Sequence, residues 1–311
     1  MSRGALRALV LRRAPAPALR ALRRAQRSRA RMRHRVRRRL DPVRVTGAEI
    51  GAALAAAGLS RGDNVFFQSA MSPFGEIEGG PETVLRALDE VLGAEALVAM
   101  PAFPFRGSVL EYLRDDPCFS VRSTPSSMGS VSERFRQLPG TVRSLHPTHS
   151  VSARGPGAES LVAGHELALT PFGEGTPFAR LLERDAYQVW FGTDVHAFTL
   201  YHTFECLLGD RFPIDVFLEK PVSVRCEDAA GEPLRVATLV HDPAVAAHRI
   251  RSQARQQVRA ELLAEGVMRA VPLGASELLV CRIPAMFTVL DRLLAQGLTI
   301  YDIDLEGRDG R

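Results

Sequence analysis

The 311-residue chain is 46% hydrophobic and 24% charged, a balance typical of a folded protein with a substantial core and unlike a disordered chain or a mini-protein. Its cysteines, Cys118, Cys206, Cys226 and Cys281, are far apart, so neither a zinc ribbon nor a disulfide scaffold is expected and a reducing cytoplasm fits. No apolar run approaches the ~18–20 residues that a membrane span needs, which excludes a transmembrane protein.

Charge divides the chain into two unlike parts. Residues 1–40 hold 15 arginines and no acidic residue, so residues 41–311 hold 25 basic and 35 acidic residues and carry a net charge of −10. We therefore expect a basic arm over 1–40 and a folded domain over 41–311. The arm is expected to be a solvated, disordered extension. The alternative is that it docks on nucleic acid or on an anionic membrane surface, although it has no aromatic residue to stack on bases.

From Asp41 onward short apolar runs alternate with helical periodicity, which predicts a single α/β domain with a mixed central sheet flanked by helices. The first helix begins with a capping box of Thr46 and Glu49 and ends at Gly58. The elements expected next are strand 64–68, helix 81–92, strand 96–100, helix 131–137, a helix from 177 capped by Thr176, strand 187–192, helix 198–208, strands 222–225 and 277–282, and helices 245–265 and 285–295. Residues 102–127 are expected to be an irregular loop.

Thr199, His202 and Glu205 recur at a spacing of three in the helix expected over 198–208, so the histidine lies between the other two on one face. This is a candidate general-base unit: Glu205 would orient the imidazole, and Thr199 would hydrogen-bond a substrate or an oxyanion. The positive end of the helix favours a neutral imidazole, which can accept a proton at pH 7. A core histidine beside an incidental glutamate would give the same pattern.

The densest polar stretch of the chain is R-S-L-H-P-T-H-S over residues 143–150. Pro147, between His146 and His149, favours a loop over a helical face that could bind a metal. A zinc site would need further ligands, for which the candidates are His202, Glu205, Cys118 and Cys206. No standard spacing supports such a site, and hydrogen bonding around a buried turn is the simpler interpretation.

Six segments follow one another in a recognisable order. They are Q-S-A-M-S at 68–72, M-P-A-F at 100–103, T-P-S-S-M-G at 124–129, R-S-L-H-P-T-H-S at 143–150, the P-F-G-E-G-T-P-F-A-R-L stretch within 170–182, and T-L-Y-H-T-F-E at 199–205. Together they resemble the aminoglycoside 3-N-acetyltransferase family, whose fold differs from that of the common GNAT acetyltransferases. The resemblance spans about residues 45–302, and six motifs in order are far more specific than any one of them.

The resemblance implies direct transfer of acetyl from acetyl-CoA to an amine of an aminoglycoside or related amino sugar, without a covalent enzyme intermediate. By the family's motif His202 would be the general base, Thr199 the residue that positions the amine, and Glu205 the orienting carboxylate. The chemistry agrees, because a sugar amine is mostly protonated at pH 7 and needs a base to free its lone pair. An acidic domain also suits a cationic small-molecule substrate.

The resemblance also assigns residues to the two ligands. Those expected at acetyl-CoA are Ser69, Ala70, Met71, Ser72, Ser126, Met128, Gly129 and Arg143, the last of which could equally be an internal ion-pair residue. Those expected to shape the acceptor pocket are His146, His149 and Asp194, and no metal is expected. Gln68, where the family more often has histidine, and the unusual 193–197 stretch leave the acceptor open, from an aminoglycoside to an amine of a polysaccharide or natural product.

Two other functions stay open at this point. One is a metal-assisted hydrolase that uses His146, His149, His202 and Glu205. The other is a non-catalytic protein that docks on RNA or membrane through its basic arm.

Overall fold

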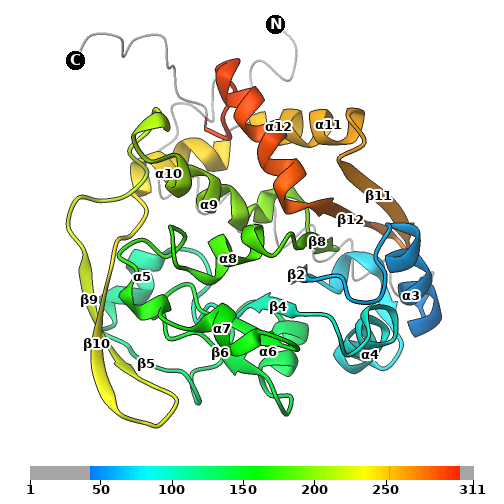
Figure 1. The fold of residues 1–311 in the computed structure, drawn as a ribbon, viewed down its shortest axis with the longest axis horizontal. Helices are drawn as coiled ribbons and strands as arrows, with labels where there is room; N and C mark the ends of the chain where they lie inside the picture. Colours follow the sequence, from blue (N-terminus) through cyan, green and yellow to red (C-terminus); the bar gives the residue numbers. More distant parts are fainter. Residues whose placement is uncertain (1–42, 252, 302–311) are drawn as a thin grey trace, which may run out of the picture. The chain divides into compact units, whose positions relative to one another are not determined.

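The computed structural model describes residues 43–251 and 253–301, so the arm expected over residues 1–40 lies outside the described residues (Figure 1). Contacts group the described chain from Val45 onward into one unit. Within that part, none of the helices combines the length and the apolarity of a membrane span.

A seven-stranded sheet runs through this unit in the order β11-β12-β8-β2-β4-β7-β6 (Figure 1). Its strands are β2 (Val65–Ser69), β4 (Val98–Pro101), β6 (Val142–Arg143), β7 (Val151–Arg154), β8 (Tyr187–Phe191), β11 (Met268–Leu273) and β12 (Ser276–Arg282). The central strand β2 is parallel to β4 and to β8, whereas every other neighbouring pair is antiparallel. The expected mixed α/β sheet is therefore confirmed.

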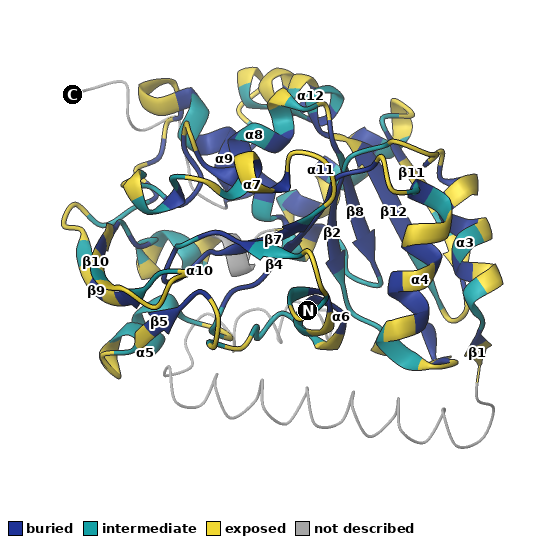
Figure 2. Cartoon of the chain, turned by 60° about the horizontal axis from the view of Figure 1, so that its bottom comes forward, coloured by how far each residue is buried: buried dark blue, intermediate teal, exposed yellow. Residues whose placement is uncertain are grey.

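Helices cover both faces of the sheet. Phe66 and Trp190 point to one face, which packs against α7 (Ala158–Val162), α8 (Pro177–Glu183), α9 (Thr199–Leu208), α11 (Ala254–Ala264) and α12 (Ile283–Ala295). Phe67 and Val189 point to the other face, which packs against α3 (Gly47–Ala56), α4 (Gly80–Leu92) and α6 (Ser130–Arg136). Because both faces are covered, the central strands are almost continuously apolar, and Figure 2 shows them buried between helices with exposed outer sides.

The local signals at helix starts are present in the structure. The Thr46 hydroxyl accepts from the backbone N–H of Glu49 at 3.3 Å, and the Glu49 carboxylate accepts from that of Thr46 at 2.8 Å, which completes the capping box of α3. The Thr176 hydroxyl caps α8 by accepting from the backbone N–H of Ala179 at 3.4 Å, with Pro177 in the first position.

The prediction of an irregular loop over 102–127 is wrong in part, because the segment contains α5 (Val109–Arg114) and β5 (Cys118–Ser120). Strand β5 belongs to a second sheet of order β10-β9-β5, with β9 (Val222–Glu227) and β10 (Pro233–Thr238). Its parallel partner β9 lies about a hundred residues later in the chain, so no local pattern reveals the pairing.

Other boundaries also differ from the prediction. The helix expected over 245–265 is divided into α10 (Pro243–Arg251) and α11, and the strands β6, β7, β10 and β11 were not predicted. The remaining elements are the strand pair β1 (Arg44–Val45) and β3 (Glu76–Ile77) and short 3-10 turns at Ser72–Phe74, His165–Leu167, Val195–Ala197 and Gly209–Arg211.

Candidate active site

His202 and Glu205 lie one turn apart on α9 and contact each other. The Nδ1 of His202 is 2.7 Å from Oε2 of Glu205, and both side chains are buried. Since a carboxylate only accepts hydrogen bonds, Nδ1 carries the proton in this contact and donates it to Glu205. The Nε2 atom is then the basic nitrogen of the ring. The contact expected from the spacing of three is therefore present.

Tyr301 holds the other side of the Glu205 carboxylate. Its hydroxyl donates to Oε1 of Glu205 at 2.7 Å, from a segment that follows α12. The carboxylate is thus fixed between a phenol and an imidazole. Sequence reasoning missed Tyr301, because it is almost a hundred residues from Glu205 and no motif surrounds it.

A second chain of hydrogen bonds orients Thr199 at the start of α9. The side-chain amide of Gln68 donates to the Thr199 hydroxyl at 2.9 Å, and the Gln68 carbonyl oxygen accepts from the amide of Gln188 at 3.2 Å. These partners assign the orientation of the Gln68 amide. Since Thr199 accepts from Gln68, its own hydroxyl proton is available to another acceptor. Gln68 therefore orients Thr199, which lies one turn before His202 on α9.

The two histidines of the 143–150 block shape a buried turn between β6 and β7. The Nδ1 of His146 accepts from the backbone N–H groups of Thr148 and His149 at 3.3 and 3.0 Å, so its proton is on Nε2, 3.3 Å from the Thr238 hydroxyl. Burial holds the pKa of His146 well below its usual range. The His149 ring packs against Phe103, and its Nδ1 is 2.9 Å from the Thr148 hydroxyl.

Arg143 is buried and bonded inside the protein. Its guanidinium donates to the Ser150 hydroxyl and to the backbone carbonyls of Thr124 and Ala102, and it lies 4.7 Å from the ring centre of Phe119. These contacts join three segments of the chain and favour an internal role over phosphate binding. The alternative expected for Arg143 was an internal ion pair. These hydrogen-bond partners are instead neutral carbonyl and hydroxyl oxygens.

The two loops expected at acetyl-CoA lie next to each other. The loop 69–72 leaves the carboxyl end of β2, and the loop 126–129 leads into α6. A Cβ on Gly129, whose φ is +110°, would lie 3.6 Å from the carbonyl oxygen of Ser69. The Ser69 hydroxyl is buried and has no hydrogen-bond partner in the described part of the chain. The Ser126 hydroxyl accepts from the backbone N–H of Met128, which tightens the second loop.

Asp194 lies just before α9, at the start of the 3-10 turn 195–197. Its carboxylate accepts from the backbone N–H of His196 at 2.8 Å. The structure thus gives Asp194 a capping role in the segment that leads into α9.

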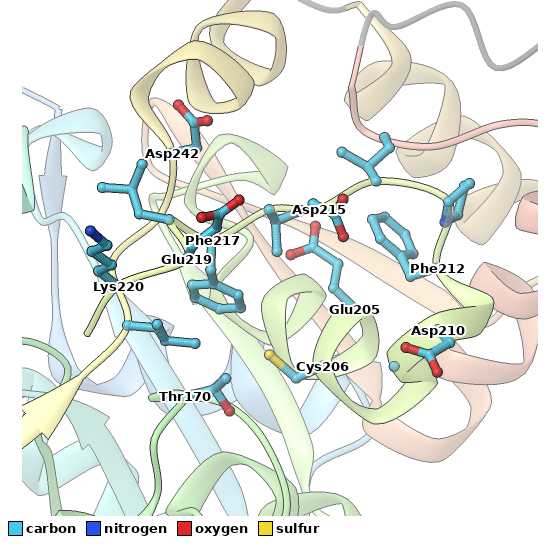
Figure 3. Close-up of a pocket in the computed structure, with 16 residues that line it drawn as sticks. Thr170, Glu205, Cys206, Asp210, Phe212, Asp215, Phe217, Glu219, Lys220 and Asp242 are labelled. Carbon is cyan, nitrogen blue, oxygen red and sulfur yellow. The ribbon is translucent and has the colours of Figure 1, made fainter. Parts of the chain in front are cut away.

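A cavity of about 1290 Å³ opens beside Glu205 (Figure 3). Its charged lining residues are Glu205, Asp210, Asp215, Glu219, Asp242 and Lys220. Five carboxylates against one ammonium group make the cavity acidic, which favours a cationic ligand. These acids come from α9, from the segment 210–220 and from the residue that precedes α10, so the sequence alone did not show that they converge.

The thiol of Cys206 also lines this cavity, but burial raises its pKa to about 12. The group is therefore protonated at pH 7 and is a poor nucleophile. This argues against a covalent intermediate on Cys206.

His241 was not singled out in the sequence, yet it lies against the base unit. Its ring centre is 4.3 Å from that of His202 and 4.6 Å from that of Phe217. His202, Glu205 and His241 each offer a metal-ligating atom, and these atoms lie within 4.8 Å of one another. In the described residues, His146 and His149 do not join this group, so the ligand set of the alternative hydrolase is not assembled.

Comparisons with known proteins point to the family that the six ordered motifs resemble. The profile of the family described as aminoglycoside 3-N-acetyltransferase matches residues 66–295. Aminoglycoside N(3)-acetyltransferase VII of Streptomyces paromomycinus is 33% identical over 198 residues, which cover 58% of this chain and 67% of that protein. The crystal structure of aminoglycoside acetyltransferase AAC(3)-Xa superposes with a TM-score of 0.68 at 25% identity, over 86% of this chain and 99% of that one. AAC-IIIb, solved as a binary complex with CoASH, has the same fold, with a TM-score of 0.67 at 24% identity over 82% and 98% of the two chains.

Proposed function

The chain belongs to the aminoglycoside 3-N-acetyltransferase family and is an acyltransferase, and from that premise we propose that it transfers acetyl from acetyl-CoA to an amine of an aminoglycoside or related amino sugar. The observation that carries the proposal is the buried chain His202–Glu205–Tyr301, whose carboxylate lines an acidic cavity. We assign the activity to residues 41–311, which contain the family match over residues 66–295.

In this proposal His202 is the general base. The acceptor amine arrives as an ammonium ion, and Nε2 of His202 takes its proton so that the lone pair can attack. Glu205 keeps the other ring nitrogen protonated before the transfer and stabilises the imidazolium after it. Tyr301 fixes the carboxylate in that position, and the Thr199 hydroxyl, oriented by Gln68, donates to the reacting groups.

The residues of the two adjacent loops fit acetyl-CoA. The buried Ser69 hydroxyl has no hydrogen-bond partner in the described part of the chain and can bond a ligand, and Gly129 lies beside the Ser69 carbonyl without a side chain that would fill this space. Ser69 to Ser72 and Ser126 to Gly129 would hold it, and it supplies the activated acetyl group when bound. Arg143 donates to the backbone oxygens of Ala102 and Thr124, and the second bond holds the segment that leads into the second loop.

A thiol-release assay tests the proposed reaction. The full-length chain with acetyl-CoA is expected to release CoA when an aminoglycoside or an amino sugar is added, and to be inactive with a neutral sugar of the same size. If no amine causes release and CoA does not raise the melting temperature, the proposal is wrong, because a ligand that binds only the folded state must stabilise it.

The acidic cavity predicts how the acceptor is bound. Replacing Asp215 and Asp242 together by asparagine is expected to raise KM for a polycationic aminoglycoside by about 10-fold, because each lost charge contact is worth roughly 0.5–1 kcal/mol. The change should become smaller at high salt. Glu159→Gln, an exposed carboxylate on α7 outside this cavity, is the matched control and should leave KM unchanged. An equal KM for the double variant and the control would contradict the assignment of the cavity to the acceptor.

Gln68 predicts a smaller effect on turnover. Gln68→Leu removes the donor to Thr199, and the loss of one hydrogen bond worth about 1 kcal/mol should lower kcat about 5-fold. Gln68→His, which restores a ring N–H at this position, should recover part of that loss. If Gln68→Leu lowers the melting temperature but leaves kcat unchanged, Gln68 is a structural residue only.

A further inference from the structure

A second chemical property follows from the position of His241. Its imidazole, that of His202 and the Glu205 carboxylate each offer one ligand atom, all within 4.8 Å of one another. Two imidazole nitrogens and one carboxylate oxygen are a common set of zinc ligands in proteins that leaves a coordination position open.

We propose that His202, Glu205 and His241 bind a divalent transition-metal ion such as Zn²⁺, and that the bound ion inhibits the enzyme by occupying the base. The ion is an inhibitor in this proposal and is no part of acetyl transfer. The metal site itself does not depend on the proposed reaction.

The three ligand atoms lie near the spacing that an ion requires. Tetrahedral Zn²⁺ bonds of about 2.0–2.2 Å place ligand atoms about 3.3–3.6 Å apart, and the three atoms here lie within 4.8 Å of one another, so the side chains must adjust to surround an ion. His202 and Glu205 are carried by one helix. His241 comes from a separate segment, in which its backbone bridges to Phe217 and its ring packs on the Phe217 ring. Tyr301 donates to Glu205, as the outer partners of metal-binding carboxylates commonly do.

The cavity gives the ion a route and an electrostatic attraction. Glu205 projects from α9 into the acidic cavity, whose other carboxylates include Asp215 and Asp242 (Figure 3). A cavity with an excess of carboxylates raises the local concentration of cations. Of the three proposed ligands, Glu205 lines this cavity. Coordination through Nε2 of His202 would remove the lone pair that accepts the proton of the amine.

The test is a metal-binding titration of the full-length, untagged chain after treatment with a chelator. Zn²⁺ is titrated against a coloured indicator, and Co²⁺ is used as a spectroscopic probe, because tetrahedral Co²⁺ has strong visible bands. We expect one ion per chain, and a dissociation constant at least about 10-fold weaker in both His241→Ala and His241→Gln. His248→Ala, an exposed histidine on α10, is the matched control and should bind as the unchanged chain does.

Inhibition provides the second measurement. Zn²⁺ should stop thiol release by the unchanged chain, EDTA should restore it, and the concentration for half inhibition should rise at least about 10-fold in His241→Gln relative to that variant's own metal-free rate. Unchanged Zn²⁺ affinity in both His241 variants would overturn the proposal. So would loss of binding in Cys206→Ser alone, which would mean that the cavity thiol holds the ion. Circular dichroism checks that each variant is folded.

Discussion

Replacing His202 with alanine is expected to lower kcat by about 10²–10⁴-fold, the usual contribution of a positioned general base. The side chain is buried and its Nδ1 is 2.7 Å from Glu205, so it is already oriented before a substrate arrives. The rate is measured by thiol release at saturating acetyl-CoA and acceptor. Acetyl-CoA binding should be retained, since the loops expected at the cofactor follow β2 and precede α6 and do not include α9.

Two companion variants separate a catalytic role of His202 from a structural one. His202→Gln keeps most of the side-chain volume and a hydrogen-bonding group towards Glu205, yet it has no basic nitrogen, so its kcat should fall as far as in His202→Ala. Thr203→Ser, at a fully buried neighbour on the same helix, should keep kcat near that of the unchanged chain. A rate within about threefold of the unchanged chain in His202→Gln would remove the histidine from the mechanism.

The parts of the site that lie within one element were predictable from the sequence. Spacing of three on a helix dictates that His202 and Glu205 face each other, and the capping box fixes where α3 begins. Six motifs in order were enough to identify the family and, with it, the fold. The helix spacing and the capping box are local signals, and the six motifs are recognised by their order along the chain. None of these signals requires knowledge of which distant residues are in contact.

The parts that could not be predicted depend on contacts between distant segments. Tyr301 is 96 residues from Glu205 in the sequence, and His241 is 36 residues from it. No local periodicity indicates contacts over such separations. The convergence of the carboxylates on one cavity has the same cause. Two edge strands were also not predicted. Strand β6 is only two residues long, and β10 begins with a proline.

Two residues of the 143–150 block, the most recognisable motif of the sequence, make structural contacts within the protein. His146 and Arg143 are buried and bonded within the protein, and the turn they form brings β7 beside β4, next to the loop that precedes α6. Such a turn holds two adjacent segments in one arrangement. Burial lowers the pKa of His146 well below its usual range, so this histidine must stay neutral in the folded chain, and that requirement makes the fold sensitive to acid.

Lowering the pH from 7.5 to 5 is expected to destabilise the folded chain through His146 and His165. Both are fully buried, their rings stack at 4.4 Å, and burial lowers the pKa of His146 well below its usual range and that of His165 to about 3. Between these values and about 6.5 the unfolded chain binds protons that the folded chain does not, so the free energy of unfolding falls as the pH falls. His165 alone should account for about 2 kcal/mol at pH 5, and His146 acts in the same direction.

Urea unfolding at pH 7.5 and at pH 5 measures this difference, and His165→Gln tests its origin. In the folded chain Nε2 of His165 donates to the carbonyl of Pro171, and Nδ1 lies 2.9 Å from the Ser144 hydroxyl. A glutamine amide can donate and accept in the same way but does not titrate. The variant should therefore lose less stability between the two pH values, by about 2 kcal/mol, whereas the exposed His248→Gln should behave as the unchanged chain does. If His165→Gln loses as much stability between pH 7.5 and pH 5 as the unchanged chain does, the acid sensitivity arises at other residues, because the glutamine side chain does not titrate.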